Sequence, residues 1–199
     1  MGFSKSTIKE RSRRVLDPAV TLLASMGVPP MLVTALGLAG SFCAAWVIAG
    51  GSLFWGGVWV FGSGLCDVID GSLARRLGRE TDFGAFVDST FVRVSELVIY
   101  GALAFRYAQG GYSSLLLAVI WVAMGGSFLV SYVRARIEGL GHACKVGLFE
   151  RPERLVLLIA GLLLGQTALV AALVVIAFGT VITVVQRIHH AYYVTRRGP

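Results

Sequence analysis

The chain has 199 residues, of which 56% are hydrophobic, and carries a formal net charge of +7 at pH 7. With a mean hydropathy of +0.75 it is too apolar for one soluble domain, and it is too long for a single membrane anchor. A positive charge alone is a weak indication of nucleic-acid binding, and here the charge follows a membrane pattern, so we expect no nucleic-acid partner.

The first element expected in chain order is a short amphipathic helix. The segment LDPAVTLLASMG predicts a helix with Asp17 as N-cap, Pro18 at the first helical position and Gly27 as its stop. Its apolar residues form one stripe: Val15, Ala19, Leu22, Leu23 and Met26. We expect residues 1–27 to lie at the cytoplasmic membrane interface, although the stripe could instead pack on the helices that follow. This basic N-terminus does not resemble a cleavable signal peptide.

Six apolar stretches then predict a transmembrane bundle over residues 28–199. They cover residues 31–50, 53–76, 83–108, 113–136, 152–166 and 167–188. About 20 apolar residues are needed to cross a bilayer, and the fifth stretch is the shortest, since only Gly165 and Gln166 separate it from the sixth. We therefore expect residues 1–199 to form one all-α integral membrane domain, with six transmembrane helices preceded by a juxtamembrane amphipathic helix.

Basic residues gather on one side of these predicted spans. Lysines and arginines lie before the first span, between spans two and three, between spans four and five, and after the sixth. The opposite loops carry almost no charge apart from Arg106. This positive-inside pattern predicts a multi-pass protein of the cell membrane, with both termini and both polar loops cytoplasmic.

Three aspartates stand near the cytoplasmic ends of the second and third spans. Asp67 and Asp70 are three residues apart and share a helix face, and Asp88 follows on the next span. Ionised side chains within a bilayer are normally paired, hydrated or metal-bound. Three converging carboxylates suit Mg²⁺, Mn²⁺ or Ca²⁺, which could bridge them to a phosphate ligand. Two alternatives remain: the aspartates only pair with nearby arginines, or they serve a cation carrier.

These residues resemble the signature of the CDP-alcohol phosphotransferase family, D-x-x-D-G-x-x-A-R-(x)8-G-x-x-x-D-x-x-x-D. Seven of its eight positions match in type and spacing: Asp67, Asp70, Gly71, Ala74, Arg75, Gly84 and Asp88. The six-span layout is also similar to that family, so the resemblance covers nearly the whole chain. It implies transfer of a phosphatidyl-type group from a CDP-linked lipid, such as CDP-diacylglycerol, to an alcohol, with release of CMP.

The resemblance also implies a set of site residues and a homodimer. Asp67, Asp70 and Asp88 would hold two divalent cations, Mg²⁺ or Mn²⁺. The CDP-lipid would contact Met31, Thr34, Gly71, Ala74, Arg75, Thr81 and Gly84. Family members often carry Pro-Asn or Pro-Asp before the first span, where this chain has Met31 in place of the polar residue and keeps Thr34.

One departure bears directly on catalysis. The final aspartate of the signature falls on Val92. In the family that residue ligates the second metal and is the proposed base for the acceptor hydroxyl, whereas valine has no lone pair. Glu96 lies one turn further along, although a catalytic carboxylate must be placed to within about an ångström. The alternative is therefore a catalytically impaired relative that still binds metal and CDP-lipid.

Three further segments indicate the acceptor. SYVRARIEGLG, VGLFERPERLVLL and VVQRIHHAYY are similar to the bacterial phosphatidylinositol phosphate synthase branch of the family. In that branch, basic residues at the positions of Arg134, Arg154 and Arg187 hold the phosphate of inositol phosphate. Three cations from different helices could surround one dianion. The alternative is that they bind lipid head groups or only follow the positive-inside rule.

Overall fold

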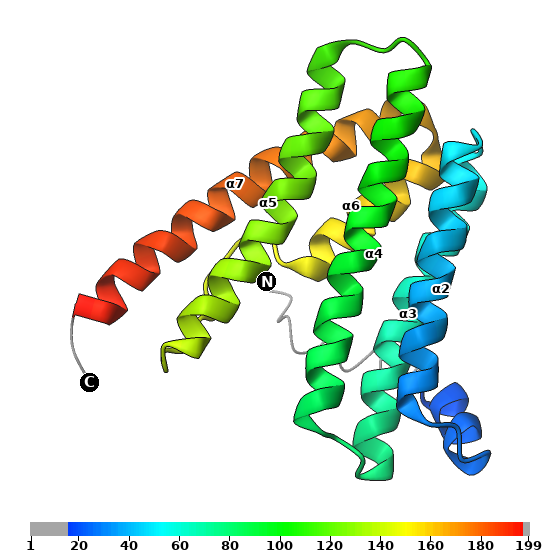
Figure 1. The fold of residues 1–199 in the computed structure, drawn as a ribbon, viewed down its shortest axis with the longest axis vertical. Coiled ribbons are helices and arrows are strands. Elements are labelled where there is room, and N and C mark those ends of the chain that lie inside the picture. The colour runs from blue at the N-terminus through cyan, green and yellow to red at the C-terminus, as the bar shows by residue number, and fades with distance from the viewer. Residues whose placement is uncertain (1–15, 197–199) are drawn as a thin grey trace, which may run out of the picture.

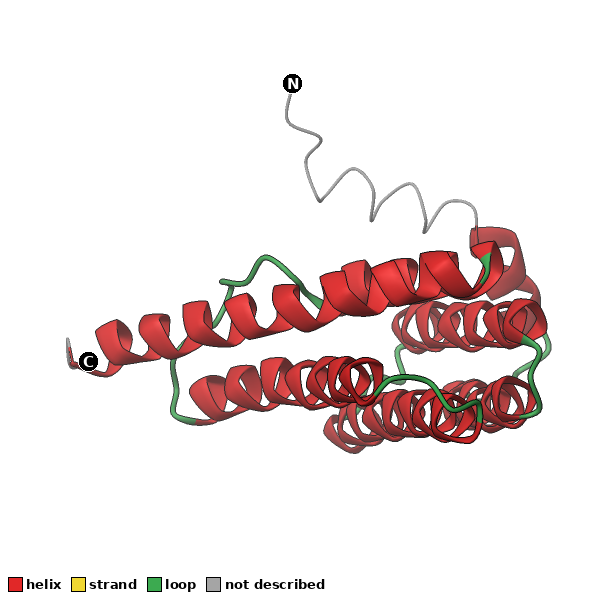
Figure 2. Cartoon of the chain, turned by 90° about the horizontal axis from the view of Figure 1, so that it is seen from above, coloured by secondary structure: helices red, strands yellow, loops and turns green. Residues whose placement is uncertain are grey.

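The computed structural model describes residues 16–196, whose regular elements are all helices (Figure 1, Figure 2). A short helix at Leu16–Ser25 precedes the main bundle. The bundle consists of α2 (Pro30–Ala49), α3 (Leu53–Leu77), α4 (Asp82–Gln109), α5 (Ser114–Gly139), α6 (Arg151–Leu164) and α7 (Gln166–Arg196). Each bundle helix matches one predicted stretch, and the largest difference is at α7, which continues to Arg196.

Four of these helices, α2, α3, α5 and α7, are long and apolar enough to cross a membrane. Helix α4 has 28 residues but carries charged side chains along its length, including Asp88, Arg93 and Glu96. Helix α6 has only 14 residues, which corresponds to about 21 Å against a hydrocarbon core of about 30 Å. The six bundle helices are therefore confirmed and four of them could span a membrane, while a crossing by all six stays a prediction.

The N-terminal helix differs from its prediction at its start. Leu16 is already helical, so the prediction of Asp17 as N-cap was wrong, and Val15 lies outside the described residues. The Asp17 carboxylate instead accepts a hydrogen bond of 2.8 Å from Nη1 of Arg76 on α3. Gly27 ends the helix as predicted, with a left-handed φ of 69°.

The same helix both packs on the bundle and exposes apolar side chains. Val20 is buried against Val33 of α2 and Leu73 of α3. Leu22 and Met26 point away from the protein and are 61% and 68% exposed. Packing through one edge, with the remaining apolar residues free to enter lipid, is consistent with a helix at the membrane interface.

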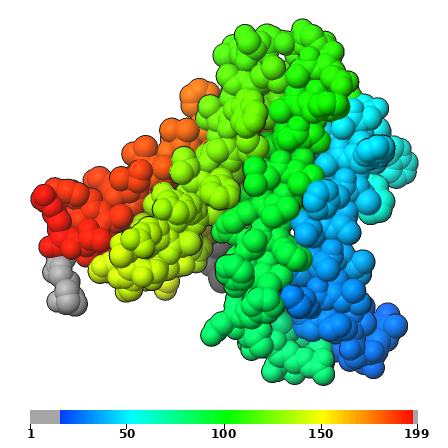
Figure 3. Space-filling view, in the orientation of Figure 1, coloured from blue at the N-terminus to red at the C-terminus, as the bar shows by residue number. Residues whose placement is uncertain are grey.

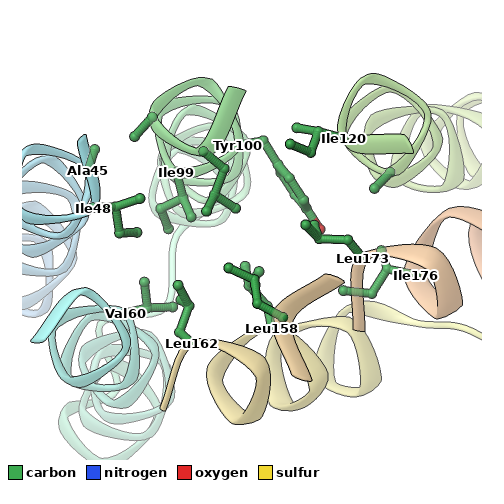
Figure 4. Packing of buried hydrophobic residues seen from close by; sticks show 14 of the residues in the cluster. Ala45, Ile48, Val60, Ile99, Tyr100, Ile120, Leu158, Leu162, Leu173 and Ile176 are labelled. Carbon is green, nitrogen blue, oxygen red and sulfur yellow. The ribbon is translucent and has the colours of Figure 1, made fainter. Parts of the chain in front are cut away.

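The larger of the two hydrophobic clusters lies at one end of the bundle. This cluster draws on all six helices, and Figure 4 shows the labelled side chains pointing inward from each of them: Ala45, Ile48, Val60, Ile99, Tyr100, Ile120, Leu158, Leu162, Leu173 and Ile176. These residues lie late in α2, α4 and α6 and early in α3, α5 and α7. At the opposite end, α5 and α7 diverge from α2, α3 and α4, which leaves the surface hollowed between α4 and α5 (Figure 1, Figure 3).

Helices α5 and α7 meet through a glycine that admits no side chain. A Cβ added at Gly126 would stand 2.2 Å from Oγ1 and 2.8 Å from Cβ of Thr180, whereas one added at Gly125 would meet nothing within 4 Å. We expect Gly126→Ala to cost about 1–3 kcal/mol through overpacking and to lower the midpoint of thermal unfolding in detergent micelles. Gly125→Ala is the matched control for helix propensity. Equal midpoints for the two variants would contradict this account of the contact.

Candidate active site

The predicted site residues gather at the open end of the bundle, around three adjoining cavities. The central cavity lies between α2, α3, α4 and α6. The α2–α4 cavity, with about 1010 Å³ of empty space, opens on one side of the aspartates. The α4–α7 cavity, with about 1200 Å³, opens on the other and is lined by α4, α5, α6 and α7.

The three aspartates stand where these cavities meet. Asp67, Asp70 and Asp88 all line the central cavity. Asp70 and Asp88 also line the α2–α4 cavity, and Asp88 reaches the α4–α7 cavity. Helical spacing explains this, because α3 turns Asp67 and Asp70 to one face and α4 presents Asp88 opposite them.

The carboxylates differ in how they are satisfied. Both oxygens of Asp67 accept hydrogen bonds from Nη1 of Arg151, at 2.9 and 2.8 Å. Asp70 is only 4% exposed, and its Oδ2, like Oδ1 of Asp88, is buried without a hydrogen-bond partner. Buried carboxylate oxygens without partners are costly, so Asp70 and Asp88 fit a divalent cation.

Within residues 16–196, no group of three His, Cys, Asp or Glu side chains is arranged to hold a metal ion. Asp67 is engaged by a guanidinium, so the described geometry offers Asp70 and Asp88 as the pair with open oxygens. The alternative that the aspartates only pair with arginines therefore accounts for Asp67 and leaves the other two unexplained.

Every residue predicted to contact the CDP-lipid lines the α2–α4 cavity: Met31, Thr34, Gly71, Ala74, Arg75, Thr81 and Gly84. Thr81 also has a local role, because its Oγ1 accepts a hydrogen bond of 3.0 Å from the Gly84 amide and caps α4. Gly71 and Ala74 leave the α3 backbone accessible beside the guanidinium of Arg75. Arg79, which was not among the predicted CDP-lipid contacts, adds a second cation to this cavity.

The three predicted acceptor arginines also come together, since Arg134 of α5, Arg154 of α6 and Arg187 of α7 line the α4–α7 cavity. Arg134 is exposed and pairs with Glu138 at 2.9 Å. Arg187 is 2% exposed. It donates from Nε to the Val146 carbonyl at 2.9 Å and from Nη1 to the Val130 carbonyl. Arg187 therefore ties the loop after α5 to α7 as well as facing the cavity.

Arg154 is as deeply buried as Arg187, and unlike Arg187 it forms an ion pair. It is 2% exposed and donates from Nη2 to Glu96 at 3.1 Å. Its Nε is buried without a hydrogen-bond partner. Glu96 is thus committed to positioning Arg154 and lines the central cavity, one turn from Val92.

Two further arginines of the site, besides Arg79, were not predicted from the sequence. Arg93 and Arg151 both line the α4–α7 cavity. Arg151 had been assigned only to the positive-inside charge, although its spacing of three residues from Arg154 places both on one face of α6. That spacing was the available signal.

Val92 forms an apolar wall of the site. It is 8% exposed and lines both the central cavity and the α4–α7 cavity. The helix therefore directs position 92 toward the aspartates, as its spacing of four residues from Asp88 predicts.

The chain is similar to known proteins over most of its length. Residues 26–185 match the model of the CDP-alcohol phosphatidyltransferase family. A phosphatidylinositol phosphate synthase of Streptomyces avermitilis is 40% identical over 187 residues, covering 88% of this chain and 77% of the relative. An archaetidylinositol phosphate synthase of Methanothermobacter thermautotrophicus is 37% identical, covering 90% of each chain.

Solved structures are similar as well. The crystal structure of Mycobacterium tuberculosis phosphatidylinositol phosphate synthase with CDP-DAG bound superposes with a TM-score of 0.83 and 32% identity, covering 90% of this chain and 94% of that one. The structure of the same synthase in complex with manganese and citrate gives a TM-score of 0.82, also with 32% identity, covering 88% of each chain.

Proposed function

Because this chain belongs to the CDP-alcohol phosphatidyltransferase family, we propose that it transfers a phosphatidyl group from CDP-diacylglycerol to inositol phosphate and releases CMP. The observation that carries the proposal is the junction of the cavities. An arginine cluster faces one side of the aspartates and a glycine-lined cavity opens on the other. Such an arrangement suits two phosphate-bearing substrates that meet at a metal.

The donor is assigned to the α2–α4 cavity. The small residues Gly71, Ala74 and Gly84 leave space for the nucleotide against the backbone, and Arg75 and Arg79 supply charge for the diphosphate. The cavity also reaches Met31 near the start of α2, and we place the exit of the lipid chains toward the bilayer there. A mycobacterial relative of similar fold has been solved with CDP-DAG bound, which supports this choice of donor.

The acceptor is assigned to the α4–α7 cavity. Arg134, Arg154 and Arg187 surround its interior and would bind the acceptor phosphate through charge-assisted hydrogen bonds. Relatives named phosphatidylinositol phosphate synthase and archaetidylinositol phosphate synthase support a phosphorylated inositol.

The proposed reaction is one displacement at phosphorus. The acceptor hydroxyl oxygen forms a bond to the lipid-bearing phosphorus of the donor, the bond from that phosphorus to the CMP oxygen breaks, and the hydroxyl proton is released. Asp70 and Asp88 would hold a divalent cation, with Asp67 beside them, and a bound Mg²⁺ or Mn²⁺ would neutralise charge on the diphosphate. Arg154 and Arg187 would hold the acceptor phosphate and so orient the acceptor hydroxyl toward the phosphorus.

The membrane arrangement forms part of the same proposal. Residues 1–199 would form one domain of a homodimer in the cell membrane, with α4 and α6 crossing the bilayer beside the four apolar helices. The active site and both termini would face the cytoplasm, where CMP and inositol phosphate are soluble. The alternative of a catalytically impaired relative that still binds metal and CDP-lipid draws no support from the comparisons, because the named relatives are synthases.

The arginine cluster provides a direct test of this assignment. Arg134→Gln is expected to raise the KM for inositol phosphate by roughly tenfold, because one charge-assisted hydrogen bond is lost, and to leave CDP binding unchanged. Arg134 is suitable because it is exposed, so its replacement should not unfold the protein. The matched control is Arg136→Gln on the same helix, an exposed residue outside the cavity lining. Equal KM values for the two variants would remove Arg134 from the acceptor site.

A further inference from the structure

The charges at the junction of the cavities are unevenly distributed. Three aspartates stand there, yet only Asp67 has both oxygens engaged, by the guanidinium of Arg151. Asp70 and Asp88 each keep a buried oxygen without a partner. The position that would bring a fourth carboxylate is Val92, whose apolar side chain lines the same central cavity.

Charge balance at this junction favours one divalent cation together with one guanidinium. Two divalent cations neutralise four carboxylates, whereas one divalent cation and one arginine neutralise three. Uncompensated charge within a membrane protein is costly, so the loss of a carboxylate at Val92 removes the reason for a second metal. The observed pair between Asp67 and Arg151 already supplies one of the two cationic partners that this count requires.

Arg151 is placed to act on a ligand as well as on Asp67. It is the first residue of α6, where Pro152 fixes the direction of the first turn. In the described part of the chain, only its Nη1 makes hydrogen bonds. Its side chain is 36% exposed and borders both the central cavity and the α4–α7 cavity. Nε and Nη2 are therefore available to a phosphate oxygen.

We propose that this chain holds a single divalent cation at Asp70 and Asp88 and that the guanidinium of Arg151, bound to Asp67, takes the place of a second one. The inference rests on the proposed function for the identity of the ligand. In that setting Arg151 contacts the lipid-bearing phosphate of the donor from the acceptor side, and neutralises charge on it in the way a second metal would.

The first test counts metal without turnover. Purified protein in detergent is titrated with Mn²⁺, and free Mn²⁺ is measured from its electron paramagnetic resonance signal. The unmodified chain is expected to bind one Mn²⁺, and the double variant Val92→Asp with Arg151→Met is expected to bind two. Two Mn²⁺ per unmodified chain, or one in the double variant, would overturn the proposal. Because no acceptor is present, this count is independent of whether the proposed reaction occurs.

The second test measures CDP affinity at saturating Mn²⁺. Arg151→Met is expected to weaken binding about tenfold or more, since charge-assisted hydrogen bonds to the diphosphate are lost, whereas Arg151→Lys keeps the charge and loses less. Arg136→Met serves as the control for removal of a cytoplasmic-side arginine. Unchanged CDP affinity in Arg151→Met would show that Arg151 only pairs with Asp67, and it would overturn the proposed contact between Arg151 and the donor phosphate.

Discussion

Val92→Asp is expected to raise the rate of CMP release by roughly 10²–10⁴-fold, the usual contribution of a general base. Val92 is 8% exposed and lines the cavity that also holds the three aspartates. A carboxylate at this position would face the acceptor side of the site, because Val92 also lines the α4–α7 cavity. It could take the proton of the acceptor hydroxyl, which valine cannot.

The measurement compares CMP release by both proteins at saturating Mn²⁺ with inositol phosphate as acceptor. Val92→Asn is the control, because it has a similar size and polarity to aspartate but cannot accept the proton as a base. An equal rate for the unmodified chain and Val92→Asp would mean that the base lies elsewhere. Glu96 would then be tested first, although its carboxylate is held by Arg154 at 3.1 Å.

Asp70→Asn is expected to abolish metal-dependent binding of CDP. Asp70 is 4% exposed, its Oδ2 is buried without a partner, and it borders both the central and the α2–α4 cavity. An amide keeps the shape but removes the charge that a divalent cation requires. Loss of groups that only support a metal ligand costs about 10–100-fold in affinity, so loss of the ligand itself should cost at least about 100-fold.

The experiment measures CDP affinity with Mn²⁺ and again with a chelator. The control is Asp82→Asn, an exposed aspartate in the first turn of α4 that does not line the cavities described here. The unmodified protein and the control should both lose affinity when the chelator is added, whereas Asp70→Asn should bind weakly under both conditions. If Asp70→Asn keeps the metal-dependent difference, the cation does not depend on Asp70.

The apolar stretches predicted the bundle helices well, because burial in lipid and burial in a core both require continuous apolar runs. Membrane crossing was harder to predict for α4, whose functional charges interrupt its apolar surface, and for α6, which is short. The start of the N-terminal helix was missed because Asp17 resembles an N-cap locally, whereas its side chain is committed to Arg76, 59 residues away. A local signal could not reveal that tertiary pair.

The site shows the same division between local and distant information. The aspartates and glycines fall within one short motif, so their spacing alone brought them together. Arg151 meets Asp67 across 84 residues, and Glu96 meets Arg154 across 58. These pairs depend on where the packing of α6 against α3 and α7 places Arg151 and Arg154, and nothing in the spacing of the motif specifies that packing. The positive-inside rule also accounts for the charge of Arg151, so that charge alone does not mark it as a site residue.

The most direct test of the central claim is CMP release from CDP-diacylglycerol by the purified, unmodified protein at saturating Mn²⁺, with inositol phosphate, inositol and glycerol phosphate compared as acceptors. The account predicts slow release that requires Mn²⁺ and is fastest with inositol phosphate. Release that is equally fast with unphosphorylated inositol would contradict the assignment of the arginine cluster. No release with any acceptor, from protein that binds CDP-diacylglycerol normally, would contradict the proposed transferase activity itself.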